Sequence, residues 1–279
     1  MKQGIKHSVK EIIKQNDIGT CVICGKNGKL TKEHIPPRCA FNKNTIRVSS
    51  MTDMMTANLL PWEGGKVENA IIQGGFSLKS LCKECNEQTG ALYGRAYKSF
   101  IKCISDAMES VTLQPNQECH IRNAKFKPLN VFKQIVSMFN SLNPGCFKSK
   151  KIDMKEFLLN KDVNKFCRNV HFYMFLTRDS VSAPIMGKCS SVNGKLYTFI
   201  SSEVSHYPIG IIMALNHELE NELCINSFLD FKYDEEINAD FTISYHERNL
   251  PIVGDFRTKE QISACNQCNR TKRQVTNGG

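Results

Sequence analysis

Hydrophobic residues recur at two spacings along the chain, and the change from one to the other separates helices from strands. After the second of two early cysteine pairs, apolar residues return every three or four positions, which predicts a helix that ends near Glu109. The same spacing predicts helices from about Leu129 to Leu142 and from Asp153 to about Phe166. Asp153 and Glu156 form a capping box at the start of the latter.

Apolar runs beyond Val170 shorten to strand length. They comprise His171 to Leu176, Leu196 to Ile200, Ile209 to Leu215 and Phe241 to Tyr245. A polar stretch from Val111 to Lys127, with Pro115 and Asn116 as its turn, predicts a hairpin. Residues 38–67 have no clear period and are expected to form a long loop. The predicted fold class is therefore α+β, with a mostly antiparallel sheet in the second half.

Cysteine is the unusual component of the composition. The 279 residues include thirteen cysteines, six of them in three Cys-x-x-Cys pairs: Cys21/Cys24, Cys82/Cys85 and Cys265/Cys268. The odd total, the Lys-rich beginning and the lack of a secretory apolar segment favour a reducing, cytoplasmic location. The longest relevant apolar run, Ile209 to Leu215, is far shorter than the roughly 20 residues of a membrane span, so no membrane partner is expected.

The first two pairs supply four thiolates, which is the ligand set of a closed tetrahedral zinc site. Gly25 and the Asn27-Gly28 pair let the chain turn tightly and reverse into a hairpin, while the second pair opens the predicted helix. A redox dithiol is the alternative, but it requires a thioredoxin-like βαβ pattern that the sequence lacks. We therefore expect structural Zn²⁺ bound by four ligands: Cys21, Cys24, Cys82 and Cys85.

A zinc ion at these thiolates would bring three polar residues from distant positions together. Glu33 and His34 follow the first pair, and Asn86 directly follows the second. Since its unperturbed pKa is about 6.5, His34 can take a proton from water at neutral pH. Glu33 and Asn86 offer hard oxygen ligands for Mg²⁺ or Mn²⁺, which would stabilise charge on a scissile phosphate.

The order Cys-x-x-Cys, Glu-His-Ile-Pro-Pro, Gly-Gly and Cys-x-x-Cys-Asn, from Cys21 to about Gly94, resembles the zinc-braced HNH endonucleases of the His-Me finger superfamily. The resemblance implies an N-terminal ββα-metal unit that hydrolyses phosphodiester bonds. It implies that His34 is the general base and that Glu33 and Asn86 are ligands of the catalytic Mg²⁺ or Mn²⁺. The implied substrate is DNA ahead of RNA.

The sequence also departs from the family pattern. The family's middle Asn, which orients the histidine, is expected several residues before the second cysteine pair, where this chain has Ser77 and where Asn69 is the nearest Asn. The interval from His34 to that pair is long, which indicates an insertion around residues 47–68. Strand alternation would point Glu33 and His34 to opposite faces, so both can face one ion only if the strand distorts.

Cys265 and Cys268 repeat the pattern of the second pair near the C-terminus, without a partner pair. Three interpretations stay open. The pair could bind a second zinc ion together with His246, Cys189 or Cys224, it could meet a copy in another chain, or it could belong to a basic tail without metal. The second zinc ion is our working hypothesis.

Charge adds a weak preference for a polyanionic partner. Lys and Arg outnumber Asp and Glu by 37 to 27, which gives a net charge of +10. Each phosphate that such residues neutralise releases counterions, so the excess favours nucleic acid. The basic residues on or near the helix predicted after the second cysteine pair are expected to contact the nucleic-acid backbone. For each of them, simple exposure to solvent is the alternative. They are Lys79, Lys83, Arg95 and Lys98.

The sequence thus predicts an HNH nuclease domain in residues 1–110, an α+β accessory region in 111–260 and a basic tail in 261–279. The predicted function is metal-dependent cleavage of nucleic acid, in a setting such as restriction or anti-phage defence, which rests on analogy alone. The alternative is a non-catalytic, zinc-dependent module that binds nucleic acid or protein. A homo-oligomer or a larger defence complex is a further hypothesis about its partners.

Overall fold

The computed structural model describes residues 15–49, 69–178, 181–192, 195–216, 218–219 and 222–246. The Cys265/Cys268 pair and the predicted basic tail lie outside these residues, so the hypothesis of a second zinc ion stays a prediction. Among the described residues, no helix combines the length and the apolar composition that a membrane span requires. The predicted cytoplasmic location stays a prediction.

A three-stranded antiparallel sheet and a long helical run make up the N-terminal part. In sheet order, the strands are β1 (Ile18–Thr20), β2 (Asn27–His34) and β5 (Ser77–Cys82). The helical run starts directly after β5 and consists of α3 (Lys83–Thr89), the π-helical turn η2 (Gly90–Gly94) and α4 (Arg95–Glu109). This run confirms the helix that was predicted from the second cysteine pair to Glu109.

A second, two-stranded ladder interrupts the segment that was expected to be a loop. The short helix η1 (Arg38–Ala40) follows β2, and β3 (Ile46–Ser49) pairs antiparallel with β4 (Asn69–Ile72). The expectation of a loop over residues 38–67 is therefore wrong at η1 and β3, while residues 50–68 lie outside the described part. Elements of three or four residues are too short to produce a detectable period.

The C-terminal part contains a five-stranded antiparallel sheet. In sheet order, its strands are β11 (Leu223–Cys224), β7 (Val170–Leu176), β10 (Ile209–Leu215), β9 (Lys195–His206) and β8 (Val181–Val192). The strands predicted near residues 171, 196 and 209 are confirmed, and so is the mostly antiparallel α+β class. The apolar runs did not predict β8, whose only partner in the described sheet is β9.

The hairpin predicted over residues 111–127 is wrong. β6 (Glu118–Phe126) is one continuous strand, and it pairs antiparallel with β12 (Ile237–Ser244) from the far end of the chain. Asn116 does adopt a turn conformation with φ 65°, but its amide donates to Tyr245 O over 2.8 Å. The turn residues therefore extend the ladder to β12 instead of reversing the chain.

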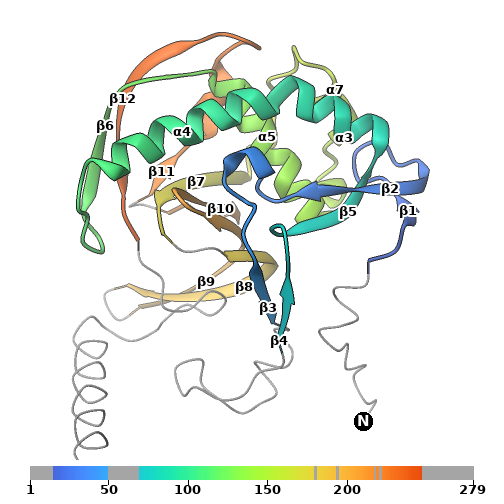
Figure 1. Cartoon of the computed structure of the whole chain (residues 1–279), viewed down its shortest axis with the longest axis horizontal. Helices are drawn as coiled ribbons and strands as arrows, with labels where there is room; N and C mark the ends of the chain where they lie inside the picture. The colour runs from blue at the N-terminus through green and yellow to red at the C-terminus, as the bar shows by residue number, and fades with distance from the viewer. Residues whose placement is uncertain are drawn as a thin grey trace, which may run out of the picture.

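The helical run lies across one side of the molecule (Figure 1). The ladder of β6 and β12 lies beside α4 at one end, β1, β2 and β5 lie beside α3 at the other, and the five-stranded sheet lies below. The remaining helices are α5 (Pro128–Leu142), α6 (Cys146–Ser149), α7 (Met154–Leu159) and η3 (Asn226–Asp230).

Helix α5 confirms the helix predicted over residues 129–142, and every one of its residues is buried. Two of its polar residues bond to the neighbouring backbone: Asn130 Nδ2 donates to Leu92 O over 3.2 Å, and Asn140 Nδ2 donates to Val22 O over 3.1 Å. These bonds allow a polar helix face to leave water. One hydrophobic cluster includes residues from both sides of the predicted boundary at residue 110. The boundary itself stays a prediction.

Helix α7 begins where the capping box was predicted, because the Asp153 side chain accepts a hydrogen bond of 3.0 Å from Glu156 N. It ends at Leu159, earlier than the predicted Phe166. The ring of Phe166 instead packs edge-on against the ring of Phe132, with 5.9 Å between the centroids. The apolar residue that suggested a longer helix thus belongs to the core beneath the loop.

Lys133, in the middle of α5, has an exposed fraction of 0%. Its Nζ donates to Asn160 O over 2.8 Å and to Lys161 O over 3.2 Å, and it lies 5.0 Å from the ring centroid of Phe157. Burial lowers the pKa of Lys133 from its ordinary 10.5 to about 8. The charged form of this side chain is therefore less favourable in the fold than in the unfolded chain.

We expect this lysine to make stability depend on pH in a defined direction. Between about pH 8 and 10.5 the unfolded chain binds more protons at Lys133, so the contribution of this residue to stability rises with pH. The free energy of unfolding of the wild type, relative to Lys133→Met, should increase by about 2 kcal/mol from pH 7 to pH 10. Urea denaturation of both proteins at both pH values measures this, and an unchanged difference would contradict it.

Candidate functional site

The first two cysteine pairs meet at one end of the helical run. Cys21 and Cys24 lie in the turn between β1 and β2, Cys82 is the last residue of β5, and Cys85 lies in the first turn of α3. The four sulfur atoms lie within 4.8 Å of one another. The amide of Gly25, at φ 73°, donates to Cys21 O over 2.9 Å and closes the turn that presents the first pair.

The geometry of this four-cysteine cluster fits a metal ion. Cys24 Sγ and Cys82 Sγ are 3.8 Å apart, far beyond a disulfide bond. Four sulfurs placed about 2.3 Å from a zinc ion at the corners of a tetrahedron are about 3.8 Å apart, which is the distance between the sulfurs of Cys24 and Cys82. The cluster could therefore hold a metal ion such as zinc.

The thiols of the cluster favour a shared cation electrostatically. Burial opposes ionisation of Cys21, but hydrogen bonds from the backbone of Cys24 and Cys82 outweigh it and lower the pKa of Cys21. Burial, together with the neighbouring thiols, strongly raises the pKa of Cys85. The group thus cannot ionise as a whole without added positive charge, which a bound metal would supply.

A pocket of about 450 Å³ lies next to the cluster, between the end of β2, helix η1 and the helical run. Glu33, His34 and Asn86, the three residues predicted to carry the chemistry, all line it. The structure therefore brings together side chains that are more than 50 positions apart in the sequence.

A bulge in β5 accompanies this convergence. Thr31 pairs with Leu81 and Lys32 pairs with Lys79, so Ser80 has no partner in β2. The carbonyl of Ser80 instead accepts a hydrogen bond of 3.0 Å from Val22 N in the turn of the cluster. The extra residue lies in β5, while the buried positions of β2, Leu30 and Glu33, are three apart rather than two. Glu33 and His34 line one pocket despite being adjacent.

Glu33 and His34 have different environments within the pocket. Glu33 has an exposed fraction of 7%, and burial raises the pKa of its carboxyl group to about 7. His34 is half-buried, and burial lowers its pKa below the ordinary 6.5, assisted by the charges of Arg38 and Lys32. The imidazole of His34 is consequently neutral at pH 7, which is the form that accepts a proton.

Asn86 joins the helical run to β2. Its Nδ2 donates to Thr31 Oγ1 over 2.9 Å and to Lys32 O over 3.0 Å. Both hydrogen bonds use the amide nitrogen, and neither uses Oδ1. The side chain therefore fixes the register of α3 on β2 while keeping its oxygen for a ligand.

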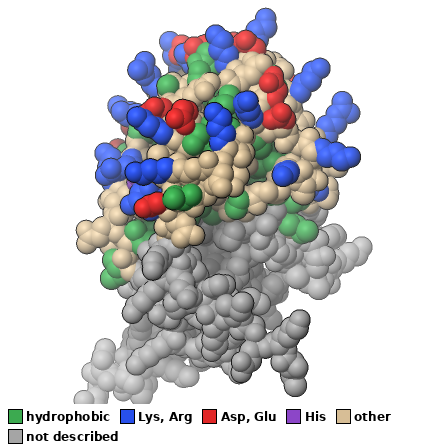
Figure 2. Space-filling view, turned by 90° about the vertical axis from the view of Figure 1, so that its right-hand side faces the viewer, with side chains coloured by type: hydrophobic (Ala, Val, Ile, Leu, Met, Phe, Trp, Pro, Cys, Tyr) green, Lys and Arg blue, Asp and Glu red, His purple; other side chains and the backbone are tan. Residues whose placement is uncertain are grey.

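The four basic residues predicted to contact nucleic acid divide into two groups. Arg95 and Lys98 line the pocket, whereas Lys83 lies 3.8 Å from Glu87 in an exposed ion pair. Lys79 forms an ion pair with Asp17. Seen from the end of the molecule that carries β1 and α3, Lys and Arg side chains are spread over the described surface, with acidic side chains between them (Figure 2).

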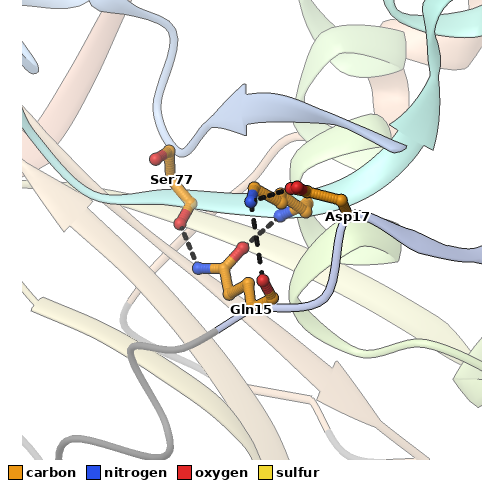
Figure 3. Close-up of polar contacts among 4 residues, drawn as sticks. Gln15, Asp17 and Ser77 are labelled. Atoms are coloured by element: carbon orange, nitrogen blue, oxygen red, sulfur yellow. Dashed lines mark hydrogen bonds and ion pairs between the residues drawn. The ribbon is translucent and has the colours of Figure 1, made fainter. Parts of the chain in front are cut away.

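Lys79 contacts the chain before β1 and does not line the pocket. Figure 3 shows Gln15 and Asp17, which belong to this segment, next to Ser77 of β5. Its backbone amide donates to Gln15 Oε1, and Gln15 Nε2 donates to Ser77 O over 2.9 Å. The ammonium group of Lys79 also lowers the pKa of Asp17 through a hydrogen bond and its charge. These contacts attach the chain before β1 to the outer side of β5.

Arg38 and Lys32 also line the pocket, although the sequence reasoning did not select them. Together with Arg95 and Lys98 they form a set of four cations, called here the pocket cations. None of the ion pairs among the described residues uses a pocket cation. Four cations without an ion-pair partner among the described residues thus line the pocket, beside the largely buried carboxyl group of Glu33, and they suit an anionic ligand.

Asn42 is a further residue that the sequence reasoning missed. Its exposed fraction is 1%, and its Nδ2 donates to Pro36 O over 2.7 Å and to Phe76 O over 2.9 Å. Its Oδ1 accepts from Phe76 N over 2.9 Å. Gly75, at φ 89°, permits this contact, because a side chain there would overlap Asn42. Asn42 therefore ties the chain that leaves His34 to the chain that enters β5.

Gln134, on α5, also lines the pocket with an exposed fraction of only 2%. Its Oε1 is buried and has no hydrogen-bond partner among the described residues. A buried acceptor without a partner costs about 1–3 kcal/mol, so its retention at a pocket points to a ligand or water that donates to it. The sequence signal was a polar residue within an otherwise apolar helical pattern.

The comparisons with known proteins give no match. No protein-family model, no curated protein and no solved structure matches this chain.

Metal binding by the cluster is testable by substitution. We expect Cys24→Ser to lower bound zinc by about one ion per chain and to lower the melting temperature, because metal binding contributes to folding. Cys103→Ser, at a cysteine of α4 outside the cluster, is the matched control and should retain its zinc content. Equal zinc content in the two variants, measured by elemental analysis, would contradict the metal site.

The hydrogen bonds that Asn42 forms with Pro36 and Phe76, called here the Asn42 clamp, lead to a separate prediction about stability. Asn42→Ala removes the partner of Pro36 O and of Phe76 N, and it leaves Phe76 O with Ile35 N alone. We therefore expect the free energy of unfolding to fall by about 3 kcal/mol. Asn238→Ala, at an exposed position on β12, should change it by less than about 0.5 kcal/mol. Similar values for the two variants in urea denaturation would show that Asn42 is not a clamp.

Proposed function

We propose that the protein is a metal-dependent endonuclease of the zinc-braced HNH type that hydrolyses phosphodiester bonds of DNA. The observation that carries this proposal is the meeting of Glu33, His34 and Asn86 in one pocket, whose wall holds four cations without an ion-pair partner in the described part of the chain. The antiparallel pair of β2 and β5, followed directly by α3, supports a ββα-metal unit. A role in restriction or anti-phage defence is an extension of the proposal by analogy.

Structural zinc is the first part of the proposal. Bound by Cys21, Cys24, Cys82 and Cys85, it would fix the turn before β2 against the start of α3. Because Asn86 directly follows Cys85, the same ligands set the position of its side chain. The zinc ion therefore has a structural role at a distance from the reacting phosphate.

His34 is the proposed general base. Its neutral imidazole takes the proton of the attacking water, and the clamp at Asn42 holds the chain just after it. Arg38 and Arg95 bind the oxygens of the phosphate that is attacked, which places the phosphorus near the imidazole and offsets the negative charge that develops. The pocket thus supplies both a base and an anion site.

A catalytic divalent cation completes the proposal. Glu33 and Asn86 Oδ1 fit this role, since the carboxyl group lines the pocket and the Asn86 amide uses only its nitrogen for protein contacts. When bound there, Mg²⁺ or Mn²⁺ would stabilise the charge on the scissile phosphate and on the leaving oxygen.

One observation favours a second candidate function. Glu33 is almost fully buried, and its raised pKa makes the carboxyl group a weak cation ligand near neutral pH. A module that lacks catalysis but binds nucleic acid through the pocket cations would have the same cluster and the same charged wall. The distinction between the two functions lies in His34, which only the nuclease requires.

Cleavage assays test the nuclease directly. We expect the wild type to cut plasmid DNA with Mg²⁺ or Mn²⁺, and His34→Ala to be about 100-fold slower or more while it retains its zinc. The matched control is His120→Ala, at an exposed histidine that contacts Thr242 and lies outside the pocket. Equal rates for wild type and His34→Ala on DNA and on RNA would favour the non-catalytic module.

A further inference from the structure

Glycine forms part of the pocket wall where the helical run passes it. Gly90 and Gly94, the first and last residues of the π-helical turn η2, both line the pocket. Cys39 Sγ of η1 lies 3.8 Å from Gly94 O, so η1 and η2 are direct neighbours across this wall. π-helical turns occur often at functional sites.

Neither glycine is required by the backbone or by packing. Gly90 and Gly94 both have φ −60°, which any residue adopts in a helix. A Cβ atom added to either one meets no atom within 4 Å, whereas a Cβ at Gly210 would overlap the ring of Phe175. Glycine inside a helix is also unfavourable relative to residues with side chains. The fold would therefore be more stable with larger residues at both positions.

Two independent features indicate that the space in front of these glycines holds a ligand. The Oε1 of Gln134 belongs to the same pocket, is buried and has no partner among the described residues. The sugar-phosphate chain of DNA only accepts hydrogen bonds, so the partner that fits is a water molecule that donates one proton to Oε1 and the other to a phosphate oxygen. The pocket cations Arg95 and Lys98 follow Gly94 on the first turn of α4 and have no ion-pair partner among the described residues. The buried Oε1 of Gln134 and the cations Arg95 and Lys98 thus line the same pocket as the two glycines, whose surface has no side chain.

We propose that the surface of η2 at Gly90 and Gly94, called here the seat, binds the backbone of the substrate. The sugar-phosphate chain next to the scissile bond lies directly against these two glycines. Arg95 and Lys98 neutralise the phosphates that flank the contact. Glycine is needed because a sugar-phosphate chain approaches the helix backbone where a side chain would stand. This inference deepens the proposed function, since it rests on nucleic acid as the partner of the same pocket.

Binding assays on a variant that does not cleave test the seat. In the His34→Ala background, Gly94→Leu should raise the Kd for a labelled DNA or RNA oligonucleotide of about 20 nucleotides by 10-fold or more. The slope of log K against log salt should become less steep by about one, because a phosphate contact is lost. Ala91→Leu places the same side chain on the same turn, at an exposed position that does not line this pocket, and should change Kd less than about twofold.

Stability should move in the opposite direction to binding. Replacing a helical glycine with leucine should leave the melting temperature of Gly94→Leu unchanged or raise it by about 2–4 °C, with zinc content retained. Gly90→Leu provides a second, independent variant with the same expectation. Weaker binding by a protein that is at least as stable separates a blocked surface from a damaged fold.

Three outcomes would overturn the proposed seat. They are an unchanged Kd and salt slope in both glycine variants, an equal loss of binding in Ala91→Leu, and no binding of any oligonucleotide by the His34→Ala parent. A wild type that cleaves nothing, together with glycine variants that bind more weakly, would remove the nuclease and leave the binding seat. The two proposals therefore fail in distinguishable ways.

Discussion

Four cysteine sulfurs within 4.8 Å of one another are the constraint on which the site depends. Ionised sulfurs at this separation repel one another, and the buried thiol of Cys85 resists ionisation, so a cation is what lets the four act as ligands together. The four-cysteine cluster joins the turn before β2 to the start of α3. Every element that lines the pocket leaves from one of these two segments or packs on them.

Helix α5, which belongs to the second part of the chain, contributes residues to this site. Its residue Asn140 bonds to the turn that carries the first cysteine pair, and its residue Gln134 reaches the pocket. The buried polar face of α5 thus meets the N-terminal unit, while its apolar face packs on the core of the five-stranded part. A predicted accessory region therefore supplies one wall of the pocket.

The sequence predicted the features that depend on local pattern and missed those that depend on distant partners. The long helix after Cys82, helix α5 and the core strands of the large sheet follow from spacing, and the cysteine cluster follows from paired ligands. The hairpin over residues 111–127 failed because β6 finds its partner near residue 240. Asn42 was missed because its partner Phe76 lies 34 positions away, and no local pattern reports such a bond.

The Asn42 clamp also separates the site from the segment of chain between Asn42 and Phe76. Asn42 and Phe76 are 34 positions apart, and the chain between them leaves and returns at the Asn42 side chain. The ladder of β3 and β4 belongs to this part of the chain. Because the entropy of closing a loop grows only slowly with its length, lengthening the chain between β3 and β4 has little effect on the closed end. A longer connection between Ser49 and Asn69 would therefore leave the positions of His34 and of the start of β5 unchanged, because the hydrogen bonds of Asn42 hold them on the near side of that connection.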